Sequence, residues 1–254
     1  MACIGIFDSG AGGLSVLKEI LRVLPGERYI YYADTAHCPY GEKTTDYIFG
    51  RSLDITHSLL KQGADAIVIA CNTATAASVK KLREMMPDVP FVGMEPAIKP
   101  AAALSKTGTV GVLATASTLK AAKYLNTKEK FSNGVRIVER IGRGFVELVE
   151  SGRLDGPDTR KTVEASLCPL LDENADTIVL GCTHYPFLLP VMRDIAGEGI
   201  AFVDPAPAVA KRLLYVLKSN NIALTSTPAD TPMVQIESSG SPDTTRRLYE
   251  TILL

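Results

Sequence analysis

Tryptophan is absent from the 254-residue chain, and aromatic residues make up only 6% of it. This composition argues against a surface on which bases or sugars stack. No apolar run reaches the ~18 residues of a membrane helix, and no basic segment precedes the first one, so we expect neither a membrane span nor a secretory signal. The 27 basic residues balance 28 acidic ones, which excludes the basic footprint of a dedicated nucleic-acid binder.

The five cysteines are widely spaced and show neither a CxxC pair nor a zinc-like partner spacing with histidine. They do not predict a disulfide scaffold or a metal site, and they indicate a reduced, cytoplasmic protein. Cys3 and Cys168 are expected in the core. Hydrophobic residues are 46% of the chain and charged residues 22%, as in ordinary globular proteins with a sizeable core.

Short apolar runs alternate with amphipathic helical patterns along the chain, which predicts an α/β fold with mainly parallel sheets. The expected strands are Ile4–Phe7, Tyr29–Tyr32, Ala66–Ala70, Phe91–Met94, Val110–Ala114, Arg136–Ile141, Thr177–Leu180, Ala201–Val203 and Val234–Glu237. The expected helices are Leu14–Leu24, Ile48–Gln62, Ala74–Met86, Thr159–Asn174 and Val209–Asn220. Ligands of such folds bind beyond the carboxyl ends of the strands.

A weak internal repeat divides the chain. The segment Ile67–Thr73 resembles Ile178–His184, and Ile4–Ser9 resembles Val110–Thr115 at a similar separation. The repeat predicts two similar domains that face each other across a central cleft with pseudo-two-fold symmetry. We expect residues 1–95 with 207–254 in the first domain and 96–206 in the second, with crossings at the proline-containing stretches.

The two halves of the repeat carry equivalent cysteines, Cys71 and Cys182, each at the end of an apolar strand and before a predicted helix. The start of a helix lowers the pKa of a thiol and favours anionic ligands. A single cysteine is more often a small buried hydrophobe, but two at equivalent places predict a cleft with one thiol on each wall. Such a pair suits the removal of a proton from one face of a carbon and its delivery to the other.

Asp8 and His184 are the polar neighbours that would assist these thiols. Asp8 follows the first strand, and His184 lies two residues after Cys182. The alternative interpretations are an N-terminal helix cap for Asp8 and an ordinary loop histidine for His184.

Four blocks of sequence, in order and spread over nearly the whole chain, resemble the signature blocks of the bacterial glutamate racemase family. They are Asp8–Leu14, Pro39–Gly41, Ala70–Ala74 and Gly181–Pro186. The family belongs to the cofactor-independent aspartate/glutamate racemase superfamily. The resemblance implies that Cys71 acts on D-glutamate with help from Asp8, and that Cys182 acts on L-glutamate with help from His184.

The resemblance also implies further site residues. Glu150 matches a family glutamate near the second thiol, although Arg143-Gly144 stands before Phe145 where many members carry Cys-Pro. The implied substrate contacts are Asp8, Ser9, Tyr40, Gly41, Asn72, Thr73, Thr115, Thr118, Thr183 and His184.

The expected activity is therefore the interconversion of L- and D-glutamate for peptidoglycan synthesis, in a homodimer that needs no metal, cofactor, nucleic acid or membrane. The alternatives are an aspartate or hydantoin racemase of the same superfamily and a non-catalytic amino-acid-binding module. A one-thiol decarboxylase would lack one of the cysteines. A pyridoxal phosphate racemase would need a lysine at one of the strand ends, and none is there.

Overall fold

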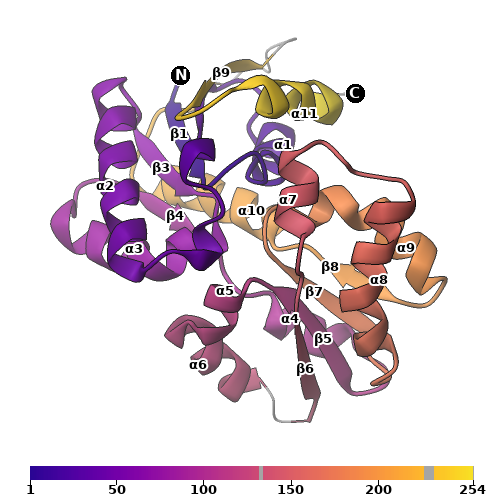
Figure 1. Ribbon diagram of the computed structural model, residues 1–254. Helices are drawn as coiled ribbons and strands as arrows, with labels where there is room; N and C mark the ends of the chain where they lie inside the picture. The colour runs from indigo at the N-terminus through magenta and orange to yellow at the C-terminus, as the bar shows by residue number, and fades with distance from the viewer. Residues whose placement is uncertain (132–133, 226–231, 254) are drawn as a thin grey trace. The chain divides into compact units, whose positions relative to one another are not determined.

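The computed structural model describes residues 1–131, 134–225 and 232–253. Contacts divide the chain into two units, of which unit 1 comprises Met1–Met94 with Ala206–Leu254 and unit 2 comprises Glu95–Pro205. Each unit is built around one parallel sheet with helices on its faces (Figure 1).

The sheet of unit 1 has the strand order β4-β3-β1-β2-β9, and every neighbouring pair is parallel. Its central strand β1 is buried along its whole length, as expected for a strand covered on both faces. The strands are β1 (Cys3–Asp8), β2 (Arg28–Ala33), β3 (Ala66–Ile69), β4 (Phe91–Gly93) and β9 (Met233–Ser238).

The helices of unit 1 form two groups. Helices α2 and α3 lie side by side (Figure 1) and bury apolar residues against one face of the sheet, while α1 packs on α10 and α11. The helices are α1 (Leu14–Val23), α2 (Thr45–Lys61), α3 (Asn72–Met85), α10 (Ala206–Ser219) and α11 (Asp243–Leu253), with short 3-10 helices η1 (Thr35–His37) and η2 (Tyr40–Glu42).

Unit 2 has the strand order β6-β5-β7-β8, again with parallel pairs throughout. Helices α8 and α9 pack on each other, and α4 packs on α6 and on the central strands (Figure 1). The strands are β5 (Thr109–Ala114), β6 (Arg136–Ile141), β7 (Thr177–Gly181) and β8 (Ala201–Val203). The helices are α4 (Ile98–Leu104), α5 (Ala116–Lys120), α6 (Ala122–Phe131), α7 (Phe145–Glu150), α8 (Pro157–Leu171), η3 (Tyr185–Leu188) and α9 (Leu189–Ala196).

The two sheets share one topology. Replacing β1, β2, β3 and β4 by β5, β6, β7 and β8 converts the first strand order into the second, with β9 added at one edge. Packing repeats as well. A Cβ on Gly5 would meet Ile67 Cδ1 at 2.9 Å, and a Cβ on Gly111 would meet Ile178 Cδ1 at 2.6 Å. Both glycines therefore let a neighbouring isoleucine cover the central strand.

The structure confirms the predicted fold class, two similar α/β parts with parallel sheets, and contains all nine predicted strands and all five predicted helices. Six further α-helices, α4, α5, α6, α7, α9 and α11, had no residue range assigned from the sequence. Within the described residues, none of the helices combines the length and apolar character that crossing a bilayer requires. The predicted cleft and its symmetry stay predictions.

Candidate active-site residues

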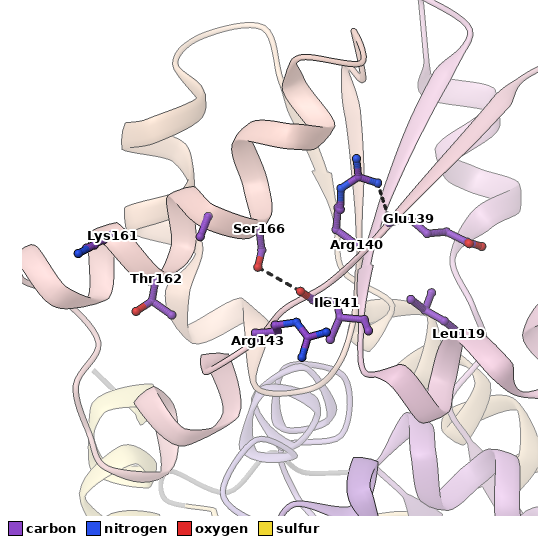
Figure 2. A pocket seen from close by; sticks show the side chains of 9 residues that line it. Leu119, Glu139, Arg140, Ile141, Arg143, Lys161, Thr162 and Ser166 are labelled. Carbon is purple, nitrogen blue, oxygen red and sulfur yellow. Dashed lines mark hydrogen bonds between the residues drawn. The ribbon is translucent and has the colours of Figure 1, made fainter.

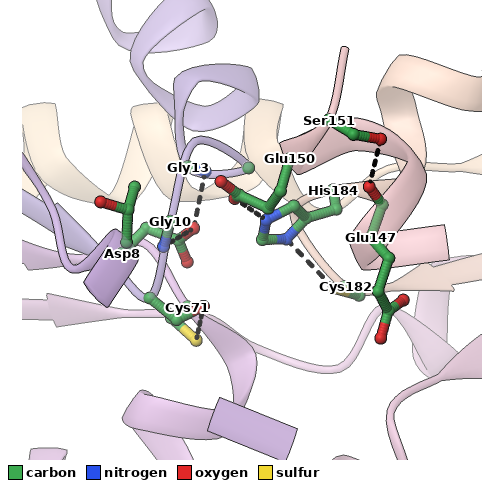
Figure 3. Close-up of polar contacts among 12 residues, drawn as sticks. Asp8, Gly10, Gly13, Cys71, Glu147, Glu150, Ser151, Cys182 and His184 are labelled. Carbon is green, nitrogen blue, oxygen red and sulfur yellow. Dashed lines mark hydrogen bonds and ion pairs between the residues drawn. The ribbon is translucent and has the colours of Figure 1, made fainter. Parts of the chain in front are cut away.

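The carboxyl ends of β1 and β3 bring four predicted residues of unit 1 together. These strands are neighbours, with Phe7 opposite Ile69, so the residues that follow them emerge at the same edge of the sheet. We call Asp8, Ser9, Cys71 and Asn72 the Cys71 cluster (Figure 3 shows two of them).

The Cys71 thiol caps helix α3. It is 5% exposed, and its Sγ accepts a hydrogen bond from the Ala74 backbone N–H at 3.4 Å. The Ser9 hydroxyl lies 3.8 Å from Sγ, where the thiol can donate to it. The free N–H groups and the positive end of a helix stabilise a negative charge, so this position favours the thiolate of Cys71.

Asp8 lies at the end of β1 and is fully buried. Its Oδ2 accepts hydrogen bonds from the backbone N–H groups of Gly10 and Gly13, both at 3.1 Å (Figure 3). These bonds hold the turn that leads into α1, but Asp8 is not the N-cap of that helix, because the N-cap residue is Gly13. A Cβ on Gly13 would come within 2.7 Å of the Asp8 Cβ, so the approach of the turn to the carboxylate depends on glycine at this position.

Asn72 carries a buried polar atom that the described part of the protein leaves unpaired. Its side-chain Nδ2 is buried and has no hydrogen-bond partner among the described residues. Buried polar groups in native proteins are nearly always paired, because an unpaired one loses its hydration without compensation. An N–H donor next to Cys71 is suited to a substrate carboxylate, and the adjacent Thr73 is also buried.

Tyr40 is anchored by a buried ion pair. Its hydroxyl donates a hydrogen bond to Asp34 Oδ2 at 2.6 Å. Arg51 donates two hydrogen bonds to the same carboxylate, from Nε to Oδ2 at 3.0 Å and from Nη2 to Oδ1 at 2.8 Å. Burial alone would raise the pKa of Asp34, but hydrogen bonds from Arg51, Tyr40 and Ser239 together hold that pKa below its ordinary value. Burial, Asp34 and the nearby Cys71 raise the pKa of Tyr40. The phenol is therefore a neutral hydrogen-bond donor.

In unit 2, Cys182 follows β7 and contacts a histidine–carboxylate pair. Cys182 Sγ lies 3.7 Å from His184 Nδ1, and His184 Nε2 lies 2.6 Å from Glu150 Oε1 at the end of α7. Figure 3 shows the imidazole between the two partners. Cys182 is 8% exposed and His184 1%. We call Cys182, His184 and Glu150 the Cys182 cluster.

The geometry of the Cys182 cluster suits proton transfer. With its Nε2 proton directed at Glu150, His184 presents Nδ1 as an acceptor for the thiol proton, and the carboxylate stabilises the imidazolium that results. The adjacent Tyr185 packs edge-to-face on Phe145, the first residue of α7, with ring centroids 5.0 Å apart. Its hydroxyl donates to the Gly142 carbonyl at 3.4 Å. These contacts fix the helix that carries Glu150.

The remaining predicted residues of unit 2 also lie beyond strand ends. Thr115 follows β5 and caps α5, where its Oγ1 accepts from the Thr118 N–H at 3.2 Å and lies 2.9 Å from the Thr118 hydroxyl. Thr183 is 4% exposed and lies between Cys182 and His184. Strand β7 pairs with β5, so these threonines belong to the same edge of the sheet as Cys182.

Comparison with known proteins identifies the family. The family model described as Asp/Glu/Hydantoin racemase matches residues 4–213. The chain belongs to this family. A glutamate racemase of Ectopseudomonas mendocina is 49% identical over 224 residues, which are 88% of this chain and 85% of the relative.

Solved structures of glutamate racemases are similar to nearly the full length of this chain. Escherichia coli glutamate racemase in complex with L-glutamate and an activator has a TM-score of 0.86 and 32% identity, covering 99% of this chain and 95% of the other. Francisella tularensis glutamate racemase in complex with D-glutamate has a TM-score of 0.82 and 29% identity, covering 99% and 93%.

Two details of the structure differ from the sequence-based expectation. Cys71 starts an α-helix directly, but Cys182 is followed by a turn and the 3-10 helix η3 before α9 begins. Pro186 and Pro190 near the helix start cannot donate backbone hydrogen bonds, which favours this interrupted path. Cys168, expected in the core, is only partly buried on α8.

The pair Asp34 and Arg51 was missed by the sequence analysis. Asp34 lies two residues after the strand-like run Tyr29–Tyr32, a position at which a buried carboxylate could have been suspected. Nothing local marks Arg51, because it lies inside an amphipathic helix with other charged residues. The residues of the two clusters include no lysine that could hold pyridoxal phosphate.

Proposed function

We propose that this member of the Asp/Glu racemase family interconverts L- and D-glutamate by two-base proton transfer at Cα, without a cofactor. The observation that supports this most directly is the repetition of a thiol. Cys71 follows β3 and Cys182 follows β7, the corresponding strands of two sheets with one topology. The names and substrates of the relatives described above favour glutamate.

In the proposed reaction one cysteine is a thiolate and the other a thiol. The thiolate takes the Cα proton, and the electrons of the broken C–H bond remain on the substrate as a carbanion delocalised into its carboxylate. The thiol then delivers its proton to the opposite face of Cα. The product is the mirror image of the substrate, and the two cysteines have exchanged protonation states.

Each thiol has its own means of changing protonation state. We assign the reaction of D-glutamate to Cys71, supported by the α3 N-terminus and by Asp8. We assign the reaction of L-glutamate to Cys182, from which His184 accepts a proton while Glu150 stabilises the charge. A thiol of ordinary pKa near 8.5 is mostly protonated at neutral pH, so both need such assistance.

The proposed substrate contacts are hydroxyls, backbone N–H groups and amides suited to two carboxylates and an ammonium group. The unpaired Asn72 amide supports this assignment in unit 1. The full set is Asp8, Ser9, Tyr40, Gly41, Asn72, Thr73, Thr115, Thr118, Thr183 and His184.

The deciding experiment incubates the full chain with each glutamate enantiomer in D2O and follows Cα deuteration by NMR together with optical rotation. We expect inversion accompanied by solvent deuterium at Cα of the product. L-aspartate and a substituted hydantoin are the parallel substrates. Turnover of either in preference to glutamate would assign the alternative racemase, and glutamate binding without exchange would assign a binding module.

We also propose that the D-glutamate serves peptidoglycan synthesis in the cytoplasm and that the enzyme is a homodimer. The composition without a disulfide pattern supports the location, and the family resemblance supports the dimer. Light scattering coupled to size exclusion gives the mass in solution, and a value near 27.2 kDa, the mass of one chain, would exclude the dimer.

A further inference from the structure

Unit 2 contains a cavity of about 730 Å³ that none of the residues assigned to substrate or catalysis lines. Its walls come from α5, from the end of β6, from the link between β6 and α7, and from α8 (Figure 2). The volume falls within the range of ~300–1,000 Å³ that small-molecule sites occupy. The cavity is thus large enough for a ligand of its own.

The charged side chains of the cavity are mostly cationic. Arg140, Arg143 and Lys161 line it, against one acid, Glu139. The carboxylate of Glu139 is already bound, because its Oε1 accepts from Lys128 Nζ at 2.7 Å and from the Tyr124 hydroxyl at 2.5 Å. The negative charge in the lining is therefore neutralised by Lys128, a residue that does not line the cavity.

The positive charges, in contrast, are largely unmatched. Among the described residues, the Arg143 guanidinium has no hydrogen-bond or ion-pair partner, and neither has the Lys161 ammonium. Arg140 donates from Nη1 to the backbone carbonyl of Glu139 at 2.8 Å and keeps its other donors. Figure 2 shows Arg143 beside Ile141 and the Lys161 ammonium directed outward, so the arginines are the principal donors.

The rest of the lining is apolar or already donates its hydroxyl protons. Leu119, Ile141 and Ala165 supply apolar surface. Ser166 donates to the Ile141 carbonyl at 3.1 Å, and Thr162 donates to the Asp158 carbonyl at 2.8 Å. The cavity therefore offers cationic hydrogen-bond donors from the arginines and, elsewhere in its wall, an apolar surface.

We propose that this cavity binds a small organic anion, a phosphate or carboxylate group on an apolar body. The planar guanidinium of Arg143 can form two parallel hydrogen bonds with a phosphate or carboxylate group, a bidentate pair. Arg140 adds a second guanidinium. The apolar body would contact Ile141 and its neighbours. This site is distinct from the two thiol clusters, and its existence does not depend on the proposed racemase function.

The test measures binding of phenyl phosphate to the full chain by calorimetry, in the presence of saturating glutamate. We expect binding to the unaltered protein and a loss of affinity of about tenfold or more in Arg143→Gln, as for one charge-assisted hydrogen bond. Arg140→Gln is expected to weaken binding less. Lys106→Gln is the control, because it removes an exposed cation before the start of β5, at the opposite end of the sheet.

Two further probes separate the parts of the ligand. Phenol is expected not to bind, since it lacks the charge, and inorganic phosphate is expected to bind more weakly than phenyl phosphate, since it lacks the apolar body. Equal affinity in the unaltered protein and in Arg143→Gln would overturn the proposal. So would displacement of phenyl phosphate by glutamate, because the probe would then occupy the substrate site.

Discussion

Removal of the Arg51 side chain should leave a buried charge in unit 1 without its partner. The Asp34 side chain is fully buried, that of Arg51 is 23% exposed, and two hydrogen bonds join them. Arg51→Met keeps much of the aliphatic volume and removes only the guanidinium. The remaining partners of the carboxylate, Tyr40 and Ser239, are neutral.

The expected cost follows from this burial. Breaking a buried ion pair by removing one partner destabilises a protein by about 3–5 kcal/mol, because the other charge stays buried and uncompensated. The partial exposure of Arg51 lets water reach the site, so we expect about 3 kcal/mol. The matched control is Arg22→Met. Arg22 pairs with Glu19 on α1 but its side chain is 71% exposed, and exposed pairs contribute less than about 1 kcal/mol.

The pH dependence separates lost charge pairing from lost packing. The folded pKa of Asp34 lies below its ordinary value, so in the unaltered protein this carboxylate stabilises the fold above the unfolded Asp pKa of about 3.9. That stability is lost as the pH falls through the folded pKa. In Arg51→Met, burial is no longer opposed by the guanidinium, so the carboxyl takes up a proton more readily as the pH falls.

The difference between the two proteins should therefore be largest near pH 7 and should shrink towards pH 4. Urea unfolding followed by far-UV circular dichroism at both pH values measures it. A loss below 1 kcal/mol at pH 7, or an equal loss at both pH values, would refute the reasoning that Asp34 is charged and held by Arg51.

Three further predictions concern catalysis. Cys71→Ala and Cys182→Ala should each abolish racemisation with circular dichroism unchanged, while Cys168→Ala should retain it; full activity in either of the first two excludes the two-base scheme. Asp8→Asn should increase the primary isotope effect with Cα-deuterated D-glutamate, and His184→Asn should do so with the L-enantiomer; equal increases for both enantiomers would contradict the separate assignments. Dialysis against EDTA should leave activity intact and the absorbance spectrum free of a cofactor band, whereas activity restored only by added metal would disprove cofactor independence.

The strands could be predicted from sequence because a parallel strand covered on both faces must be apolar at nearly every position. Strand β3, for example, is buried at all four of its residues. The missed helices lack such a signal. Helix α7 has only six residues, too few for a helical period to show. Helix α6 carries several lysines and buries only Tyr124, so its pattern is that of a polar segment.

The candidate site was predictable where one local pattern carries the chemistry. A thiol at the end of an apolar strand is visible in sequence at both Cys71 and Cys182. Contacts between distant segments are not visible in this way. The position of Glu150 near the second thiol was anticipated only through the family resemblance, and the pair of Asp34 and Arg51 depends on how α2 packs on the sheet. Such pairs are set by tertiary packing.

Cys71 and Cys182 occupy equivalent positions in the two halves of the repeat, but the groups around the two thiols differ. Cys71 receives a backbone N–H and the positive end of α3, a fixed environment that titration does not remove. Cys182 precedes a turn and a short 3-10 helix, which provides no comparable long dipole, and instead contacts His184, which in turn bonds to Glu150. A helix dipole supplies at most about 1 kcal/mol, whereas a histidine can take the thiol proton outright. The repeat therefore places one thiol at a helix start and the other beside a histidine–carboxylate pair, and the isotope-effect measurements on Asp8→Asn and His184→Asn test whether the two clusters act separately.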